Sequence, residues 1–181
     1  MPPDFDTTRL VLRDATAADA LCIGVLGMQV FLDTYATGGI RPTVALEVRS
    51  AYSTERCLAI LSDPVQRVQV AEYDAHLIGF HQLSLRATHE LAPPGVQAEL
   101  VRLYVQEPFT ACGVGSALLR SAEGLAAAQG ADVLWLTPWV HNHRALGFYA
   151  ARGFQDHGMT LFRFEGEAHE NRVLAKALPA A

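Results

Sequence analysis

Between Ala98 and Gly130 the sequence combines one acidic residue with a glycine-bearing loop, a combination that could do chemistry on an anionic ligand. Glu99 lies in an apolar segment that ends at Val105, and the glycines of residues 113–115 directly precede an apolar-periodic segment. A glycine turn that opens a helix points backbone N–H groups outward, and the helix dipole adds partial positive charge at that end. The spacing therefore predicts an anion-binding site, and a phosphate group is the expected ligand.

The glycines alone do not identify the phosphate. Leu118 stands where a dinucleotide fingerprint has its third glycine, and no lysine follows Gly115 as in a nucleotide P-loop. The alternative is that Gly113 and Gly115 only permit a tight turn between a strand and a helix. His141 and His143 lie two residues apart with no third ligand in view, so we expect surface residues at a helix start and no metal site.

Length, composition and charge favour one soluble domain over residues 1–181. Half of the 181 residues are hydrophobic, which is enough for a full-sized core. The net charge of −5 argues against a nucleic-acid partner, because neutralising a polyanion needs clustered Lys and Arg. An acidic balance instead favours a cationic small molecule.

The cysteines and the start of the chain predict a cytoplasmic protein. Cys22, Cys57 and Cys112 are odd in number and have no metal-type spacing, so we expect a reducing compartment. The longest apolar run, residues 20–32, is too short to cross a bilayer, and the first ten residues lack a signal-peptide pattern. No membrane partner is therefore predicted.

Capping signals and apolar periodicity predict the elements before the main sheet. A short strand is expected over residues 8–13, and Thr16 with Asp19 three residues later is a capping signal for a helix. A second helical region begins near residue 42, breaks at Ser53, which offers a new N-cap, and ends at residues 63–64. The first helix is expected to bury a stripe of residues spaced three or four apart, namely Leu21, Val25, Met28 and Leu32.

Most of the expected strands follow these helices. Residues 65–72 and 77–85 predict an antiparallel hairpin, residues 88–95 a loop, and residues 98–105 the strand that carries Glu99. The helix from Gly113 has Gly130 as its C′ residue, and a short apolar strand over residues 133–137 comes next. The stripe that this helix is expected to bury is Val114, Leu118, Ala122, Leu125 and Ala126.

The end of the chain completes the predicted fold class. Strand, helix and strand over residues 98–137 form a crossover unit, which makes the two strands parallel. A helix is expected over residues 142–152, with Asn142 as N-cap, Gly153 as C-cap and Phe154 as the contact after it. Two closing strands over residues 160–164 and 171–177 flank a turn at residues 165–167. We therefore expect an α/β (α+β) fold with a mixed, mostly antiparallel sheet and helices on both faces.

Two motifs in this order resemble those of the GNAT superfamily of acetyl-CoA-dependent N-acetyltransferases. The first is Leu103-Tyr104-Val105 followed by residues 110–119, TACGVGSALL, and the second is residues 142–149, NHRALGFY, followed by Gly153-Phe154. The opening strand and helix and the closing residues 173–176 are also similar to the family, so the resemblance covers almost the whole chain. It implies a GNAT-like three-layer α/β/α fold with splayed central parallel strands.

The resemblance implies acetyl-CoA, or coenzyme A, as cosubstrate, with no metal. Thr110 stands where the family usually has Arg or Gln, so we expect backbone N–H groups and the helix dipole to hold the pyrophosphate, with the hydroxyls of Thr110 and Ser116. Cys112 is expected to be a small apolar filler rather than a covalent acetyl carrier. The residues that the resemblance assigns to the cofactor are Leu103, Tyr104, Val105, Thr110, Cys112, Gly113, Val114, Gly115, Ser116, Asn142, Phe148 and Tyr149.

The same resemblance supplies catalytic candidates. An alkyl ammonium with a pKa of about 10.4 cannot attack a thioester at neutral pH, so a base must take its proton, and desolvation raises the pKa of a carboxylate towards the useful range. In the family a Glu at the position of Glu99 often has this role, directly or through a water. A tyrosine at the position of Tyr149 lies near the coenzyme sulfur and protonates the leaving thiolate. A backbone N–H near Val105 holds the thioester oxygen.

Each of these assignments has a plain structural alternative. In this alternative, Glu99 is an exposed strand residue or the partner of an arginine, and Asn142 is only a helix cap. Phe148 and Tyr149 are then ordinary core aromatics.

The acceptor is predicted from aromatic residues near acids. Phe31, Asp33 and Tyr35 at the end of the first helix, together with Trp139, resemble the bacterial PaiA-like polyamine acetyltransferases, and this set suits a cation. Ordinary packing of a helix end is the alternative. We expect a small-molecule amine that attacks acetyl-CoA directly in a ternary complex. An acetyltransferase for a protein N-terminus, an amino acid or an antibiotic, a non-catalytic CoA-binding sensor, and a homodimer are left open.

Overall fold

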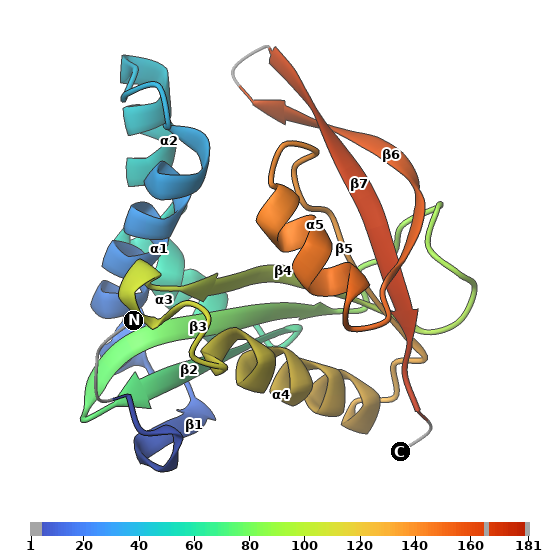
Figure 1. Cartoon of the computed structure of the whole chain (residues 1–181), viewed down its shortest axis with the longest axis horizontal. Coiled ribbons are helices and arrows are strands. Elements are labelled where there is room, and N and C mark those ends of the chain that lie inside the picture. The colour runs from blue at the N-terminus through green and yellow to red at the C-terminus, as the bar shows by residue number, and fades with distance from the viewer. Residues whose placement is uncertain (1–4, 165–166, 180–181) are drawn as a thin grey trace. The chain divides into compact units, whose positions relative to one another are not determined.

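The computed structural model describes residues 5–164 and 167–179, which include helices and strands on either side of the glycine loop. Residues 165–166 of the predicted last turn lie outside the described residues. In chain order, the helices and strands are β1 (Leu10–Asp14), α1 (Ala20–Tyr35), α2 (Pro42–Ala51), α3 (Thr54–Ser62), β2 (Gln66–Tyr73), β3 (His76–Leu85), β4 (Gln97–Val105), α4 (Val114–Ala128), β5 (Val133–Leu136), α5 (His143–Ala150), β6 (Gln155–Phe164) and β7 (Glu167–Ala177) (Figure 1).

The described residues pack as two compact units. Among the described residues, the first unit consists of residues 5–82 and 102–122, and the second of residues 83–101, 123–164 and 167–179. Within the described residues the strands are hydrogen-bonded in the order β1-β2-β3-β4-β5-β7-β6. The pairs β1–β2, β5–β7 and β6–β7 are antiparallel and β4–β5 is parallel, so the predicted mixed, mostly antiparallel sheet is confirmed. A single domain over residues 1–181 stays a prediction.

Local capping explains where the first elements begin. Asp6 caps a short 3₁₀ turn, and β1 therefore begins at Leu10, two residues later than predicted. The predicted capping signal is confirmed, because the carboxylate of Asp19 accepts a hydrogen bond from the backbone N–H of Thr16 at 2.7 Å. The break between α2 and α3 is also confirmed, since the Ser53 hydroxyl accepts a hydrogen bond from the N–H of the third residue of α3 at 3.1 Å.

The predicted core face of α1 is wrong. Leu21 is 62% exposed and Val25 is 58% exposed, and the other two residues of the predicted stripe are only half-buried. The helix is apolar around most of its circumference, so periodicity alone did not distinguish the buried side. The face that is buried instead consists of Ala20, Ile23, Gly24, Leu26 and Gly27.

Two glycines decide which face of α1 is buried. A Cβ atom on Gly24 would lie 2.5 Å from the carbonyl oxygen of Tyr52, and one on Gly27 would lie 2.4 Å from the Tyr52 ring. Tyr52 follows α2 directly and is 4% exposed. Only glycines permit this approach, so α1 turns its glycine face towards Tyr52 and its Leu21–Val25 face away from it.

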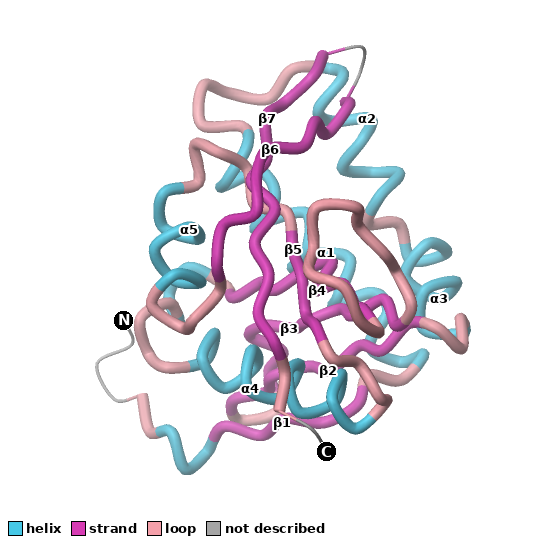
Figure 2. The backbone as a smooth tube through the Cα atoms, turned by 90° about the vertical axis from the view of Figure 1, so that its right-hand side faces the viewer, coloured by secondary structure: helices cyan, strands magenta, loops and turns pink. Residues whose placement is uncertain are grey.

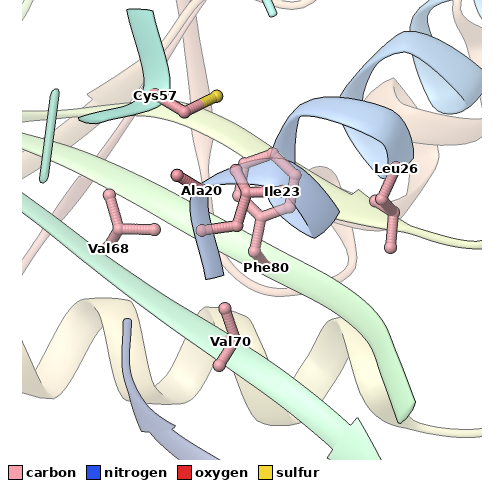
Figure 3. Close-up of a cluster of buried hydrophobic side chains, with 7 residues drawn as sticks. All are labelled: Ala20, Ile23, Leu26, Cys57, Val68, Val70 and Phe80. Atoms are coloured by element: carbon pink, nitrogen blue, oxygen red, sulfur yellow. The ribbon is translucent and has the colours of Figure 1, made fainter. Parts of the chain in front are cut away.

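One hydrophobic cluster joins the helices to the strands on one face of the first unit. Figure 3 shows its side chains converging from α1, α3, β2 and β3. Its buried members are Ala20, Ile23, Leu26, Cys57, Val68, Val70 and Phe80. Within the described part of the chain, residues 17–35 form a helical segment that is long and apolar enough to cross a membrane by length and composition alone. Three residues of this segment, Ala20, Ile23 and Leu26, lie in the cluster.

Helix α4 covers the other face of the strands in the first unit (Figure 1). Val114 and Leu118 are fully buried against Ala71 of β2 and Ile78 of β3. The predicted stripe of α4 is confirmed except that Leu125 is half-buried. The hairpin between β2 and β3 is also confirmed, and its two turn residues, 74 and 75, both have positive φ, as a two-residue turn of this kind requires.

The second unit contains the parallel pair and the closing hairpin. Residues 97–99 of β4 pair with residues 133–135 of β5, and all four residues of β5 are buried. Figure 2 shows β7 beside β6, and β7 also pairs with β5. Strands β6 and β7 are longer than predicted. The residues that the prediction missed are mostly exposed, so they do not show the apolar alternation by which a strand is recognised in a sequence. A bulge between Asp156 and Gly158 interrupts their register.

Candidate active site

Glu99 lies in the second unit, where strands β4 and β5 stop pairing. It is half-buried, and its register partner on β5 is Trp135. The described β4–β5 pairs end at these two residues, although β4 continues to Val105. The indole Nε1 of Trp135 donates a hydrogen bond to the carbonyl oxygen of Ala87 at 3.1 Å, which fixes the ring. The predicted separation of the parallel strands β4 and β5 therefore begins at Glu99, the candidate base.

Helix α5 carries the second motif, also in the second unit. The side-chain oxygen of Asn142 accepts a hydrogen bond from the backbone N–H of Ala145 at 3.0 Å, so the predicted N-cap is confirmed. Tyr149 is 8% exposed, and its ring packs edge-on against Phe148 and Phe154 at centroid distances of 5.2 and 5.4 Å. The packing holds the Tyr149 ring in one orientation, and its role as the acid stays a prediction.

Phe148 is the more accessible aromatic of this pair. Its half-buried ring lies under the guanidinium of Arg152, with the Arg152 carbon 3.7 Å from the ring centroid. Gly153 has a φ of +87° and ends the helix as predicted. The motif residues of α5 therefore form one packed group around Tyr149.

The glycine loop lies in the first unit and exposes backbone rather than side chains. Gly113 has a φ of +85°, and a Cβ atom added there would meet nothing within 4 Å, so glycine is required by the backbone conformation and not by space. Val114 is fully buried, and the Cys112 thiol packs against the α4 cluster as a small apolar filler would. Helix α4 begins at Val114, so its first N–H groups follow the loop directly.

The sequence predicts that two hydroxyls, those of Thr110 and Ser116, help the loop to hold phosphate. The hydroxyl of Thr110 donates a hydrogen bond to the backbone oxygen of Glu107 at 2.8 Å. Ser116 lies in the first turn of α4 and is half-buried, as is Gly115 before it. Thr110 is therefore already engaged within the loop, which leaves backbone N–H groups as the principal anion donors.

The strand before the loop uses its side chains for packing. Leu103 and Val105 pack against the α4 cluster, whereas Tyr104 packs with Phe80 on the opposite face of β4. The hydroxyl oxygens of Tyr104 and Tyr52 lie 2.8 Å apart in a hydrogen bond. Desolvation by burial raises the pKa of Tyr104 well above its usual range. Any contact of these three residues with a cofactor would therefore be made mainly through the backbone.

The predicted acceptor residues fall into separate local groups. In the first unit, the rings of Phe31 and Tyr35 pack at a centroid distance of 4.6 Å near the end of α1, where Asp33 is exposed. In the second unit, the Trp139 ring packs edge-on against His141 at 4.9 Å. Within residues 5–164 and 167–179, no three His, Cys, Asp or Glu residues gather as a metal-binding group.

Three residues of the first unit that matter for its chemistry were not found from the sequence. They are Tyr52, His81 and Arg102. Two of them interrupt strands that are otherwise mostly apolar, His81 in β3 and Arg102 in β4, and a polar residue inside an apolar strand is the signal that could have identified them. His81 is fully buried, and Arg102 places its guanidinium 5.0 Å from the centre of the Tyr52 ring.

Comparison with known proteins identifies the family of this chain. Residues 37–154 match the acetyltransferase (GNAT) family. An uncharacterized N-acetyltransferase of Mycobacterium bovis is 30% identical over 128 residues, which cover 71% of this chain and 77% of that protein. An uncharacterized N-acetyltransferase of Lactobacillus delbrueckii subsp. lactis, from the pepI 3′ region, is 24% identical over 84% of this chain and 88% of its own length.

A solved structure gives the same fold. The PaiA N-acetyltransferase from Thermoplasma acidophilum, in complex with coenzyme A, superposes with a TM-score of 0.75 at 23% identity and covers 93% of this chain and 98% of its own. A mixed sheet with a parallel β4–β5 pair and a glycine loop before α4, together with the family match, define an acetyltransferase fold. The chain belongs to the acetyltransferase (GNAT) family and is an acetyl-CoA-dependent N-acetyltransferase.

Proposed function

We propose that this chain transfers the acetyl group of acetyl-CoA to a primary amine by direct attack in a ternary complex, and that it does so as one catalytic domain. The observation that carries the proposal is Glu99, a half-buried acid placed where β4 stops pairing with β5. Strand pairing that ends at a residue frees the backbone beyond it for a ligand. A desolvated carboxylate at such a position suits a general base.

The proposed reaction needs a base, an oxyanion donor and an acid. Glu99 takes a proton from the acceptor ammonium, directly or through a water, and the amine lone pair forms the new C–N bond at the thioester carbon. The backbone N–H of Val105 donates to the thioester oxygen as it gains negative charge. The C–S bond then breaks, and the Tyr149 hydroxyl gives its proton to the leaving thiolate. The products are the N-acetyl amine and coenzyme A.

The proposed cofactor contacts are taken from the two motifs separately. In the first unit, the N–H groups at the start of α4 and the loop from Thr110 to Ser116 are proposed for the pyrophosphate, with support from the positive φ of Gly113. In the second unit, Asn142 is proposed for the pantetheine arm and Phe148 for contact near the thiol. Because the Asn142 oxygen caps α5, its amide N–H₂ is the group proposed to meet the cofactor.

For the acceptor we propose a polyamine. The exposed carboxylate of Asp33 beside the Phe31–Tyr35 pair supports this choice, because aromatic faces and a carboxylate both attract an alkyl ammonium. Trp139 is proposed as a further aromatic contact. The relative from Thermoplasma acidophilum is named a PaiA N-acetyltransferase, which agrees with this choice without specifying an acceptor.

A non-catalytic sensor of coenzyme A is the second candidate. The observation that favours it is the loop itself, where no Lys or Arg occurs between Leu103 and Leu119 and the Thr110 hydroxyl bonds within the loop. An acetyltransferase for a protein N-terminus, an amino acid or an antibiotic remains the other enzymatic candidate. We further propose a cytoplasmic location, supported by three free cysteines, Cys22, Cys57 and Cys112. A homodimer would be tested by light scattering.

An acceptor panel separates these functions. The protein is incubated with acetyl-CoA and polyamines, amino acids, aminoglycosides or peptides, and release of free thiol is followed. A polyamine acceptor predicts turnover with spermidine, and Asp33→Asn should raise its KM by about two- to fivefold, the effect of one exposed charge. Glu47→Gln is the control for a general loss of negative charge. Saturable acetyl-CoA binding with no turnover on any amine would instead favour the sensor.

The base is tested separately from the acceptor. Glu99→Gln should lower kcat by about 10²- to 10⁴-fold and remove the rise of rate with pH that a general base produces. Glu90→Gln, an exposed acid in the loop before β4, is the matched control and should leave the rate unchanged. An unchanged rate and pH profile in Glu99→Gln would remove Glu99 from the mechanism.

The acid is tested with a substitution that preserves packing. Tyr149→Phe keeps the ring between Phe148 and Phe154 and removes only the hydroxyl. The expected result is a fall in kcat with little change in the KM for acetyl-CoA. Tyr73→Phe, a tyrosine of the β2 end, is the control. If Tyr149→Phe turns over at the wild-type rate, another group protonates the thiolate.

A further inference from the structure

The glycine loop, residues 110–116, has a backbone conformation that needs support from outside the loop. Ala111 has a φ of +61°, in the left-handed region that residues other than glycine rarely adopt, and Gly113 has a φ of +85°. The side chain of Ala111 is exposed, so its own packing does not hold this conformation. A strained backbone persists only where the surrounding structure fixes it. The residues on either side of the loop are therefore the ones that matter for its shape.

Phe109 anchors the loop on the side of β4. It is the last residue of a short 3₁₀ turn, Glu107–Phe109, and directly precedes the loop. Its half-buried ring packs against two other rings of the first unit, with centroid distances of 5.9 Å to Phe5 and 6.1 Å to Tyr73. At the other side, Val114 is fully buried under α4. The loop backbone is thus held between an aromatic contact and the first residue of a core helix.

The aromatic contact includes the N-terminal segment of the chain. Phe5 stacks on Tyr73 with a centroid distance of 4.7 Å and an interplanar angle of 24°. The backbone N–H of Asp6 donates a hydrogen bond to the Tyr73 hydroxyl at 3.2 Å, and the Arg9 guanidinium lies 4.9 Å from the centre of the same ring. The segment is therefore fixed on Tyr73 by three separate contacts, and one of them brings Phe5 against Phe109.

A loop that binds through its backbone is sensitive to contacts of this kind. Backbone N–H donors point wherever the main chain directs them, so a change in loop conformation changes the donors themselves. The apparent affinity for a ligand falls in proportion to the fraction of molecules whose loop has the binding conformation. One edge-on ring pair is equivalent to about a two- to tenfold change in an equilibrium constant. Loss of the Phe5–Phe109 pair should therefore be measurable as a loss of affinity.

We propose that Phe5 is a positioning residue for acetyl-CoA, because it holds Phe109 and thereby keeps the glycine loop in the conformation that binds the pyrophosphate. The inference rests on the proposed role of the loop. It assigns a part in cofactor binding to the N-terminal segment, which neither of the two family motifs includes. Phe5 acts through Phe109 and not on the reacting atoms, so its loss should change the affinity for the cofactor and not the rate of the chemical step.

Calorimetric titration with coenzyme A tests the proposal at a temperature at which each variant is folded. Phe5→Ala should raise the Kd by about two- to tenfold and the KM for acetyl-CoA by a similar factor, with kcat unchanged. Phe5→Tyr, which keeps the ring, should restore both values. Leu12→Ala truncates another half-buried side chain packed against the α4 cluster, and this matched control for lost stability should leave the Kd unchanged.

Hydrogen exchange of the free protein tests the loop without any cofactor. The backbone amides of residues 110–115 should exchange faster in Phe5→Ala than in the wild type, because loop amides exchange by local opening. In Leu12→Ala they should exchange as in the wild type. Either an unchanged Kd or an unchanged exchange rate in Phe5→Ala overturns the proposal.

Gly113→Ala separates this proposal from the proposed role of the loop. An alanine is strained at the positive φ of Gly113, so this variant changes the loop backbone directly. A Kd that rises in Gly113→Ala but not in Phe5→Ala would leave the loop as the pyrophosphate site and overturn the role of Phe5. A Kd that rises in neither variant would refute the role of the loop itself. A rise in Phe5→Ala alone would show that Phe5 acts by another route, which also overturns the proposal.

Discussion

The buried imidazole of His81 makes the stability of the protein depend on pH in a way that one substitution can reveal. His81 is fully buried on β3, and its Nε2 lies 3.1 Å from the side-chain oxygen of Gln69. That oxygen already accepts a hydrogen bond from the Ser121 hydroxyl at 2.5 Å, so Nε2 carries the proton and donates. Nδ1 has no hydrogen-bond partner within the described residues. A second proton would therefore place a charge on a nitrogen with no acceptor.

Desolvation lowers the pKa of His81 to about 4, against an opposing effect of the Asp14 carboxylate. The unfolded chain, with a pKa of about 6.5, binds a proton on this residue over the range in which the folded chain does not. The contribution of neutral His81 to the free energy of unfolding is therefore fully present above about pH 6.5, and it is lost as pH falls through about 4. From the two pKa values, the loss is about 2 kcal/mol at pH ~5 and approaches about 3 kcal/mol below the folded pKa.

His81→Leu should reverse its effect on stability between two pH values. Near pH ~7.5 the variant lacks a buried hydrogen bond and should be about 1 kcal/mol less stable than the wild type. Near pH ~5 the wild type has lost about 2 kcal/mol that the variant does not lose, so the variant should be more stable by about 1 kcal/mol. Urea unfolding followed by circular dichroism at both pH values measures this difference.

The control is Val70→Ala, a change at a fully buried residue of the same sheet that binds no proton. Its destabilisation should be the same at both pH values. A stability difference between His81→Leu and the wild type that does not change with pH would refute the argument that burial suppresses protonation of His81. An NMR titration of the wild-type His81 ring provides an independent measurement, with a midpoint near 4 expected.

Two further predictions concern helix packing and capping. Gly27→Ala should cost about 1–3 kcal/mol, because its Cβ would lie 2.4 Å from the Tyr52 ring. Gly124→Ala, at a helical position with nothing within 4 Å, should instead stabilise by about 0.5–1 kcal/mol, and equal effects of the two changes in urea unfolding would contradict the packing of α1. Asn142→Ala should cost about 1 kcal/mol through loss of the cap on Ala145, whereas Asn142→Ser should retain most of that stability, and no difference between them would exclude a capping role.

Short-range signals were sufficient for much of the fold. Thr16 with Asp19, Ser53 and Asn142 each cap a helical segment where the sequence predicts it, because a cap depends on residues within one turn. Gly130 ends α4 for the same reason, with a φ of +83°. The parallel β4–β5 pair also follows from sequence, since a strand, a helix and a strand in succession permit few topologies.

The face of α1 could not be predicted from its own residues. Leu21 and Val25 have the spacing of a core stripe but are exposed, because the buried side is decided by Tyr52, which lies more than twenty residues further along the chain. Glycines 24 and 27 contribute no hydrophobicity to a periodicity analysis, yet they determine how closely that tyrosine packs. The rule that failed is that the more hydrophobic stripe faces the core.

For the candidate site, as for the fold, the motifs predict some features, and the surrounding structure determines the others. The motifs predict where Glu99 and Tyr149 lie in the chain, and the structure adds that one is half-buried at the end of strand pairing and the other is packed between two rings. The side chains of Val114 and Cys112 pack into the core, as the sequence predicts, and the backbone of the glycine loop is therefore the group that we propose for anion binding. Backbone donors need no basic side chain, so the threonine at position 110 is compatible with phosphate binding. It follows that substitutions that change the backbone conformation at Gly113 bear on cofactor affinity more directly than changes to the loop side chains.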